Sequence, residues 1–364
     1  GPMFQFIDVI QDGNVITGNG SLTGYINFAG NQSELTWNSQ QVLNVGNIDL
    51  NGGRIIFSQN SGIAPQYSFK GSGTIDLTTK TFALGTAATT WAGNFLWIGD
   101  GAIIRMNNDI TVDGTWTLSG DITIDGNGYS MDLGTTGTII LERGAQVTFN
   151  NFALYNMTNR NGIFCSDNNC QITLNYTDLI LADDFLFNKG SIYIYYDSII
   201  MPISADSDTV FTFSYATTQP LLIDSDASLA IWPGLRFSTG RQDSTITDPE
   251  LQPIIFGDPR TSRFILEGGS LHITSSGMII TKGNLLTRES SNLEIENTVY
   301  PYGLIFGDGT SENDFNLNLN SGAQLTLKSG KLFYNNYANN KINFGSQEST
   351  LAIEPQKGLS VKRD

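Results

Sequence analysis

The sequence predicts an all-β fold, a right-handed parallel β-helix of roughly 11–13 coils with three short strands in each coil. One observation behind this prediction is a run of short segments in which apolar and polar residues alternate, separated by polar or glycine-containing turns. Another is repetition, because similar units return about every 20 to 30 residues, as in residues 254–280 and 304–334. Such a unit cannot bury its own apolar face and must stack on its neighbours. Right-handed crossovers are the rule between parallel strands.

The middle strand of each unit shows the alternation most clearly. In residues 323–328, one face carries Ala323, Leu325 and Leu327, and the other carries Gln324, Thr326 and Lys328. Residues 145–149 repeat the pattern, with Ala145, Val147 and Phe149 on one face. A period of two is what a strand buried on one side requires.

The composition agrees with this fold. Charged residues make up only 15% of the chain, and long segments rich in Ala, Glu, Lys and Leu are missing, so we expect almost no helix. Asn-rich turns suit a β-helix because Asn tolerates left-handed corners and can bond to the turn of the next coil. An antiparallel sandwich is the alternative, but Asn-Gly hairpin signals are sparse and the units repeat without mirrored pairs.

We expect a single solenoid domain over residues 25–364, preceded by residues 1–24 as a tag remnant and an N-terminal cap or entry segment. Gly1-Pro2 before Met3 is typical of the scar that a protease leaves, and a natural signal peptide would have been removed with the tag. Residues 238–253 are polar and contain proline, which predicts a loop insertion. The chain ends inside a strand-like unit without a polar cap, so we expect a truncated C-terminus and self-association through open ends.

The charge of the chain excludes some partners. There are 19 Lys and Arg against 35 Asp and Glu, which gives a net charge of −16. Such a chain should repel nucleic acids and anionic membranes. No apolar run approaches the length of a membrane-spanning helix.

The two cysteines, Cys165 and Cys170, flank a four-residue polar turn between two short strands. This spacing lets the two sulfurs meet across the turn. The sequence is therefore compatible with a small disulfide and with two free thiols. No histidine lies nearby in the sequence, and two sulfurs cannot complete a tetrahedral zinc site.

The paired aspartates, Asp183 and Asp184, are the first candidates for catalysis. The single histidine, His272, lies between Leu271 and Ile273, several coils away from them. Many right-handed β-helices are polysaccharide lyases or hydrolases, and the chain resembles these pectate-lyase-like folds in its repeats. Polygalacturonase-like enzymes also carry Gly-His-Gly and Arg-Ile-Lys motifs, which this chain lacks. We expect Asp183 and Asp184 to form a turn, and they remain the candidates for a non-standard acid pair.

Acidic turns suggest calcium as a second kind of chemistry. Asp-Ser-Asp occurs at 206–208 and 224–226, and other turns supply Asp100, Asp258 and Asp308. Calcium needs six to eight oxygens around one point, and neither the EF-hand loop nor a glycine-rich nonapeptide is present. We expect no cofactor, with calcium kept as an alternative.

A third comparison concerns surface proteins. Gly52-Gly53-Arg54-Ile55, followed by Phe57-Ser58-Gln59-Asn60, resembles the GGxI and FxxN repeats of polymorphic outer-membrane autotransporter passengers. The resemblance extends in style over most of the chain. It implies an adhesin-like protein at the cell surface or outside the cell, in the bacterial envelope, with a host or cell-surface protein or glycan as its partner.

Aromatic residues are the candidates for binding. Tyr193, Tyr195 and Tyr196 form the densest cluster, and Trp232 could be a sugar-stacking platform if it is exposed. The sequence therefore predicts a non-enzymatic surface or secreted solenoid, an adhesin-like or structural stalk that makes multivalent contacts. The alternative is a carbohydrate-active β-helix, a polysaccharide hydrolase or lyase.

Overall fold

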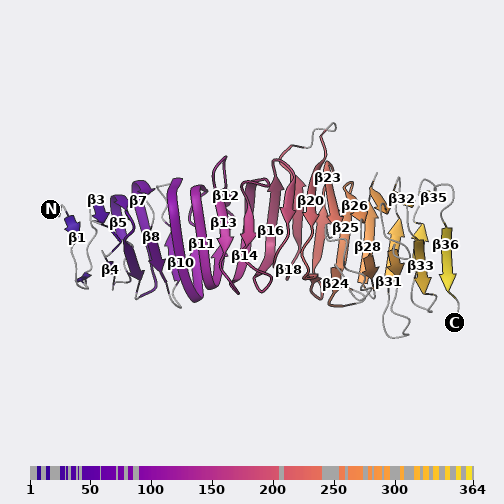
Figure 1. Ribbon diagram of the computed structural model, residues 1–364, viewed down its shortest axis with the longest axis horizontal. Helices are drawn as coiled ribbons and strands as arrows, with labels where there is room; N and C mark the ends of the chain where they lie inside the picture. Colours follow the sequence, from indigo (N-terminus) through magenta and orange to yellow (C-terminus); the bar gives the residue numbers. More distant parts are fainter. Residues whose placement is uncertain are drawn as a thin grey trace. The chain divides into compact units, whose positions relative to one another are not determined.

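The computed structural model describes residues 6–9, 14–16, 25–28, 30–31, 34–37, 40, 43–57, 59–70, 73–77, 81–84, 90–204, 209–239, 254–258, 261–273, 278–280, 283–288, 291–295, 304–306, 315–319, 323–327, 331–335, 341–344, 350–353 and 358–362. In these residues the chain is a parallel β-solenoid, as the sequence predicts (Figure 1). They contain no helix, and hence none that could cross a membrane. Internal contacts divide the chain into two compact units, residues 1–172 and 173–364.

The strands of the first unit are β1 (Phe6–Val9), β2 (Asn14–Ile16), β3 (Tyr25–Phe28), β4 (Glu34–Trp37), β5 (Leu43–Asp49), β6 (Arg54–Phe57), β7 (Ser61–Lys70), β8 (Gly73–Asp76), β9 (Thr81–Leu84), β10 (Thr90–Arg105), β11 (Ile110–Asp125), β12 (Ser130–Asp132), β13 (Thr138–Leu141), β14 (Gln146–Met157) and β15 (Ile163–Cys165). Parallel pairing includes β1 and β2, upstream of residue 25, where we expected the solenoid to begin.

The boundary between the units falls inside β16 (Gln171–Leu181). The strands that follow are β17 (Phe185–Phe187), β18 (Ser191–Ile194), β19 (Ser198–Pro202), β20 (Phe211–Tyr215), β21 (Leu221–Ile223), β22 (Ser228–Ile231), β23 (Leu235–Thr239), β24 (Ile254–Phe256), β25 (Arg263–Glu267), β26 (Ser270–Ile273), β27 (Met278–Ile280), β28 (Gly283–Arg288), β29 (Asn292–Ile295), β30 (Leu304–Phe306), β31 (Phe315–Leu319), β32 (Gln324–Leu327), β33 (Lys331–Asn335), β34 (Lys341–Phe344), β35 (Thr350–Ile353) and β36 (Gly358–Lys362).

In the second unit strands pair in parallel with the third strand after them, except that β24 and β27 belong to separate sheets. One ladder runs from β19 through β22, β25, β28 and β31 to β34. Another runs from β17 through β20, β23, β26, β29 and β32 to β35. The third contains β18, β21 and β24, and then β27, β30, β33 and β36. These ladders give three strands per coil in the second unit, as the sequence predicts. The number of coils stays a prediction, as does the loop insertion, since residues 240–253 lie outside the described residues.

The first unit builds a whole coil from one long strand. β10 pairs successively with β7, β8 and β9, and β11 matches β10 in register along almost its full length. The corners of these two strands are glycines, and Gly99 pairs with Gly120. Gly120 has a φ of +93°, and a Cβ there would lie 1.8 Å from the carbonyl oxygen of Gly99. Only glycine fits this corner.

The core consists of like residues stacked from coil to coil. In the second unit, the parallel register aligns buried side chains of five successive strands in one row: Phe213, Phe237, Leu271, Leu293 and Leu325. The predicted facing is confirmed at Ala323 and Leu325, which are buried, and at Gln324, which is exposed. The side chain of Leu327 lies outside the described part. In the first unit, Ala145, Val147 and Phe149 are also buried, which confirms their predicted facing.

Candidate functional site

A groove of about 650 Å³ lies on the second unit, over the outer face of β16, β19, β22 and β25. The parallel register places Asp178 beside Ile199, Ile199 beside Ala230, and Ala230 beside Ile265. Since side chains alternate along a strand, the next residue of each strand, such as Ile200, faces the core and is buried. The row from Asp178 to Ile265 forms the floor of the groove, whose volume is typical of ligand-binding pockets.

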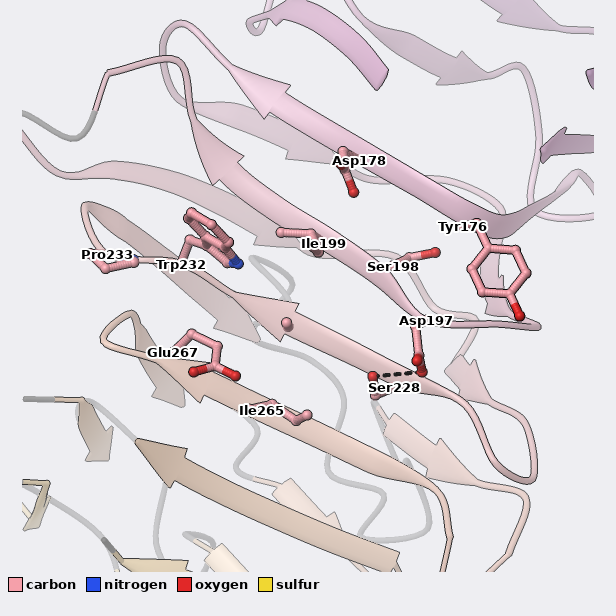
Figure 2. Close-up of a pocket in the computed structure, with 11 residues that line it drawn as sticks. Tyr176, Asp178, Asp197, Ser198, Ile199, Ser228, Trp232, Pro233, Ile265 and Glu267 are labelled. Carbon is pink, nitrogen blue, oxygen red and sulfur yellow. Dashed lines mark hydrogen bonds between the residues drawn. The ribbon is translucent and has the colours of Figure 1, made fainter. Parts of the chain in front are cut away.

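Aromatic rings stand on either side of this floor (Figure 2). Trp232 directly follows β22, and its backbone N–H donates to the carbonyl oxygen of Ile200 at 3.1 Å, which fixes it against the neighbouring coil. Pro233 extends this side of the groove, and Tyr176 lines the other. The side chains of Trp232 and Tyr176 are 41% and 55% exposed, so both rings are accessible to a ligand.

Three carboxylates line the groove, and they differ in their partners. Asp197 Oδ1 accepts a hydrogen bond from Ser228 Oγ at 2.8 Å, which is the dashed line in Figure 2. Glu267 Oε1 lies 2.5 Å from a guanidinium nitrogen of Arg288, its register partner in β28. Asp178 has no hydrogen bond or ion pair with any residue that the structure describes.

The environment of Asp178 is unfavourable for its charge. Burial raises the pKa of this carboxyl above its ordinary value, because the charged form loses water and gains no partner. Leaving a half-buried carboxylate unpaired lowers the stability of the fold. A perturbed carboxyl that lies in a groove and serves no structural bond is a candidate for function.

A buried hydroxyl holds the corner that carries Tyr176. Tyr176 has a φ of +48°, which is unfavourable for a bulky residue. The next residue, Thr177, donates its backbone N–H to Ser198 Oγ at 3.3 Å, and Ser198 Oγ donates to the carbonyl oxygen of Tyr196 at 3.2 Å. Ser198 is fully buried, so this chain of bonds ties the strained corner to the next coil.

The rings of Tyr176, Tyr195 and Tyr196 form a tyrosine cluster at the edge of the groove. Tyr176 and Tyr196 stack with centroids 4.8 Å apart, and Tyr195 meets Tyr196 edge to face at 4.7 Å. All three side chains are exposed. Tyr193 is different, because its hydroxyl donates to Asp224 Oδ2 at 2.5 Å, and burial together with Asp224 raises its pKa to about 12.

The structure separates the candidate binding residues that the sequence suggests. Trp232 lines the groove, and Tyr195 and Tyr196 flank it through Tyr176. Tyr193 lies on β18 in a different ladder, although its ring contacts that of Tyr195 with centroids 6.0 Å apart. Three further tryptophans, Trp91, Trp97 and Trp116, are buried in the core of the first unit.

Asp183 and Asp184 occupy the turn before β17 and are not among the residues that line the groove. Asp184 Oδ1 accepts the backbone N–H of Thr212 at 2.7 Å, from the next coil. Asp183 Oδ1 accepts the N–H of Asp184 at 2.8 Å. Both carboxylates thus accept hydrogen bonds from backbone N–H groups, that of Asp184 from a residue of β20.

The cysteines lie in the first unit, and both are buried, free thiols in the structure. Cys170 donates to the carbonyl oxygen of Glu142 at 3.0 Å and to Asp167 Oδ1 at 3.3 Å. Burial, followed by the neighbouring Cys170, raises the pKa of Cys165. A thiol with a raised pKa holds little of the nucleophilic thiolate.

Within the described part of the chain, no three His, Cys, Asp or Glu side chains lie close enough to hold a metal ion together. Two of the turn carboxylates that could serve calcium have protein partners: Asp224 accepts from the hydroxyl of Tyr193, and Asp258 Oδ1 accepts from the backbone N–H and hydroxyl of Thr261. Asp206, Asp208 and Asp308 lie outside the described residues. Calcium binding stays a prediction.

Sequence reasoning missed most of the groove, namely Tyr176, Asp178, Asp197 and Glu267. One signal was available, because the corner at Asn175-Tyr176 places a tyrosine where other corners have asparagine or aspartate. Comparison of the chain with protein-family models, with curated proteins and with solved structures finds no match in any of the three. The resemblance to autotransporter passengers and to pectate-lyase-like enzymes therefore stays a prediction.

Proposed function

We propose that this protein is a non-enzymatic, extracellular or cell-surface β-solenoid that binds glycans through the groove on its second unit. The observation that carries the proposal is the pair of exposed rings, Trp232 and Tyr176, on either side of a floor that Asp178, Ile199, Ala230 and Ile265 form (Figure 2). The C–H groups of a pyranose form an apolar face that packs on an aromatic ring, and its hydroxyls need polar partners beside that ring.

The rest of the groove supplies these partners. The hydroxyl of Ser228 and the carboxylates of Asp178 and Asp197 lie between the rings and accept hydrogen bonds from sugar hydroxyls. The strands beneath them are held by continuous parallel pairing, so little order has to be gained on binding. A glycan with repeated units would add avidity by engaging several copies of the protein.

A glycan array followed by calorimetry tests the proposal. We expect Trp232→Ala to weaken binding about tenfold or more, which corresponds to about 1.4 kcal/mol. Tyr129→Ala is the matched control, since Tyr129 is an exposed ring on the first unit. Loss of binding in Trp232→Ala alone supports the proposal. Absence of glycan binding, or equal affinities for both variants, refutes it.

A second candidate function rests on Asp178 and Asp197. Asp197 directly precedes β19 and lies two residues before Ile199, the register partner of Asp178, so the two carboxyls come from neighbouring coils. Inverting glycosidases separate their two carboxyls by about 6.5–9.5 Å. A carboxyl with a raised pKa suits the general acid of such a pair.

Incubation with pectic, alginate and glucan substrates separates the two functions. The glycan-binding proposal predicts no new reducing ends and no absorbance from unsaturated uronates. Turnover that is abolished in Asp178→Asn and in Asp197→Asn would replace it with a hydrolase. Turnover abolished in Asp183→Asn or Asp184→Asn would instead place the acid pair in the turn before β17.

A further inference from the structure

We infer that the groove selects glycans whose sugars carry free amino groups, an inference that rests on the proposed glycan-binding function. Among the residues that the structure describes, the charged ones that line the groove are Asp178, Asp197 and Glu267, with no Lys, Arg or His. Glycans differ in charge, and those of amino sugars are positive while those of uronic acids are negative. The lining therefore complements the positive class and repels the negative one.

Asp178 contributes most to this selectivity. The guanidinium group of Arg288 already neutralises much of the charge of Glu267, and Ser228 occupies one oxygen of Asp197. Asp178 alone has neither an ion pair nor a hydrogen bond with a described residue. An ammonium group beside Asp178 would supply the missing partner, whereas a neutral sugar would remove more of its water without replacing the charge.

The spacing of the carboxylates fits a polymer better than a single ion. Asp178 belongs to β16, Asp197 precedes β19 and Glu267 ends β25, so the three lie on three different coils, with β22 between the last two. They do not converge on one point, as the described residues hold no group that could bind a metal ion. A chain of amino sugars presents one ammonium group per ring, and the rings give Trp232 and Tyr176 apolar faces to pack on.

A lysine-rich peptide would satisfy the carboxylates but not the rest of the groove. Its side chains offer flexible ammonium groups and no flat apolar face for two fixed aromatic rings. It also pays a larger entropic cost when several long side chains are ordered. We therefore assign the groove to a cationic oligosaccharide and make the peptide an outcome of the test.

The experiment compares four probes by titration calorimetry of the full chain, namely the tetramers of glucosamine, N-acetylglucosamine, galacturonic acid and lysine. The glucosamine and N-acetylglucosamine tetramers differ only in the acetyl groups that remove the charge. We expect the wild-type protein to bind the glucosamine tetramer about tenfold more tightly than the acetylated one. The preference should shrink as salt is added.

Two variants localise the effect. Asp178→Asn should make the affinities for the glucosamine and N-acetylglucosamine tetramers nearly equal. Asp226→Asn removes one charge from an exposed turn that does not line the groove, and should keep the preference. Asp226 has a φ of +61°, which asparagine also tolerates. The comparison of the probes on the wild-type protein stands even if Asp178→Asn does not fold.

The outcomes separate the inference from the function on which it rests. Equal or tighter binding of the acetylated or galacturonic acid tetramer refutes the cationic selectivity and leaves glycan binding in place. A preference that survives in Asp178→Asn removes that residue from the explanation and refutes the assignment. Binding of tetralysine without any glycan refutes both the inference and the proposed function.

Discussion

The rings of Tyr176 and Tyr196 lie face to face, with centroids 4.8 Å apart and planes 5° apart, although both side chains are exposed. Tyr176 reaches this position with a φ of +48°. The other non-glycine residues with positive φ in the described part of the chain are all Asn or Asp. A tyrosine in such a corner breaks a local rule, and departures of this kind collect at functional sites.

We predict that Tyr176→Asn leaves the stability of the protein within about 1 kcal/mol of the wild type while it weakens glycan binding. Relief of backbone strain stabilises the variant by about 1–2 kcal/mol, and loss of the ring stack costs about 0.5–1.5 kcal/mol. Urea denaturation and calorimetry measure the two effects. Tyr196→Ala is the control, because it loses the stack without any relief of strain and should be less stable. A strongly destabilised Tyr176→Asn would show that the tyrosine is structural.

The core register gives a second prediction. Leu325 belongs to a row of buried side chains, and Leu325→Ala should lower the free energy of unfolding by about 2–5 kcal/mol. Gln324 is the adjacent residue on the outer face, and Gln324→Ala should change the free energy of unfolding by less than about 0.5 kcal/mol. Similar denaturation midpoints for the two variants would contradict this facing.

The fold could be predicted because its signal is local. The alternation at Ala323, Gln324 and Leu325 determines which face is buried, whatever the rest of the chain does. The groove depends on the register between coils, and coils of unequal length bring Asp178, Asp197 and Glu267 to one surface. Nothing near Asp178 in the sequence shows that Ile199, Ala230 and Ile265 lie beside it. Trp232 could be predicted because the chain has only 5 tryptophans, and Tyr176 was missed because its distinction is a backbone angle.

The glycine corners of the first unit give a third prediction. Gly120→Ala should destabilise the protein by about 3 kcal/mol or more, since the new Cβ would overlap the carbonyl oxygen of Gly99. Gly144 is the matched control, as its φ of +73° is similar but no atom lies within 4 Å of the added Cβ. Gly144→Ala should cost only about 1 kcal/mol. Equal losses in thermal denaturation would show that backbone strain, and not the close approach, limits this corner.

The thiols give a fourth prediction. Cys165 and Cys170 are buried, and burial raises the pKa of Cys165, so both should react slowly with an alkylating reagent in the folded protein. After unfolding without reductant, mass spectrometry should find both residues labelled. Labelling only after reduction would identify the disulfide that the spacing of the two residues also allows. Fast labelling of the folded protein would contradict their burial.

The last prediction concerns the pH dependence that Asp178 imposes. The pKa of this carboxyl is higher in the folded protein than its ordinary value of 3.8 in the unfolded chain. The folded state therefore holds the proton more tightly, and the penalty for the buried charge is absent at pH values below 3.8. This penalty grows as the pH rises from 3.8 through the raised pKa of Asp178, and it reaches its full size above that raised pKa. Asp178→Asn should thus melt at a higher temperature than the wild type near neutral pH, with a difference that vanishes in acid.

The affinity for a cationic ligand should depend on the same titration of Asp178. It should rise with pH, whereas the stability of the fold falls. A cationic sugar pairs with the charged form, so its affinity should fall as the pH drops through the raised pKa of Asp178, and binding near that pH should release a proton. Tyr176, Asp197 and Glu267, with its partner Arg288, are the other titratable or charged groups in and beside the groove, and the comparison with Asp178→Asn isolates Asp178 from them. Calorimetry in buffers of different ionisation enthalpy counts the proton. Proton release that persists in Asp178→Asn would assign the titration to one of these neighbours.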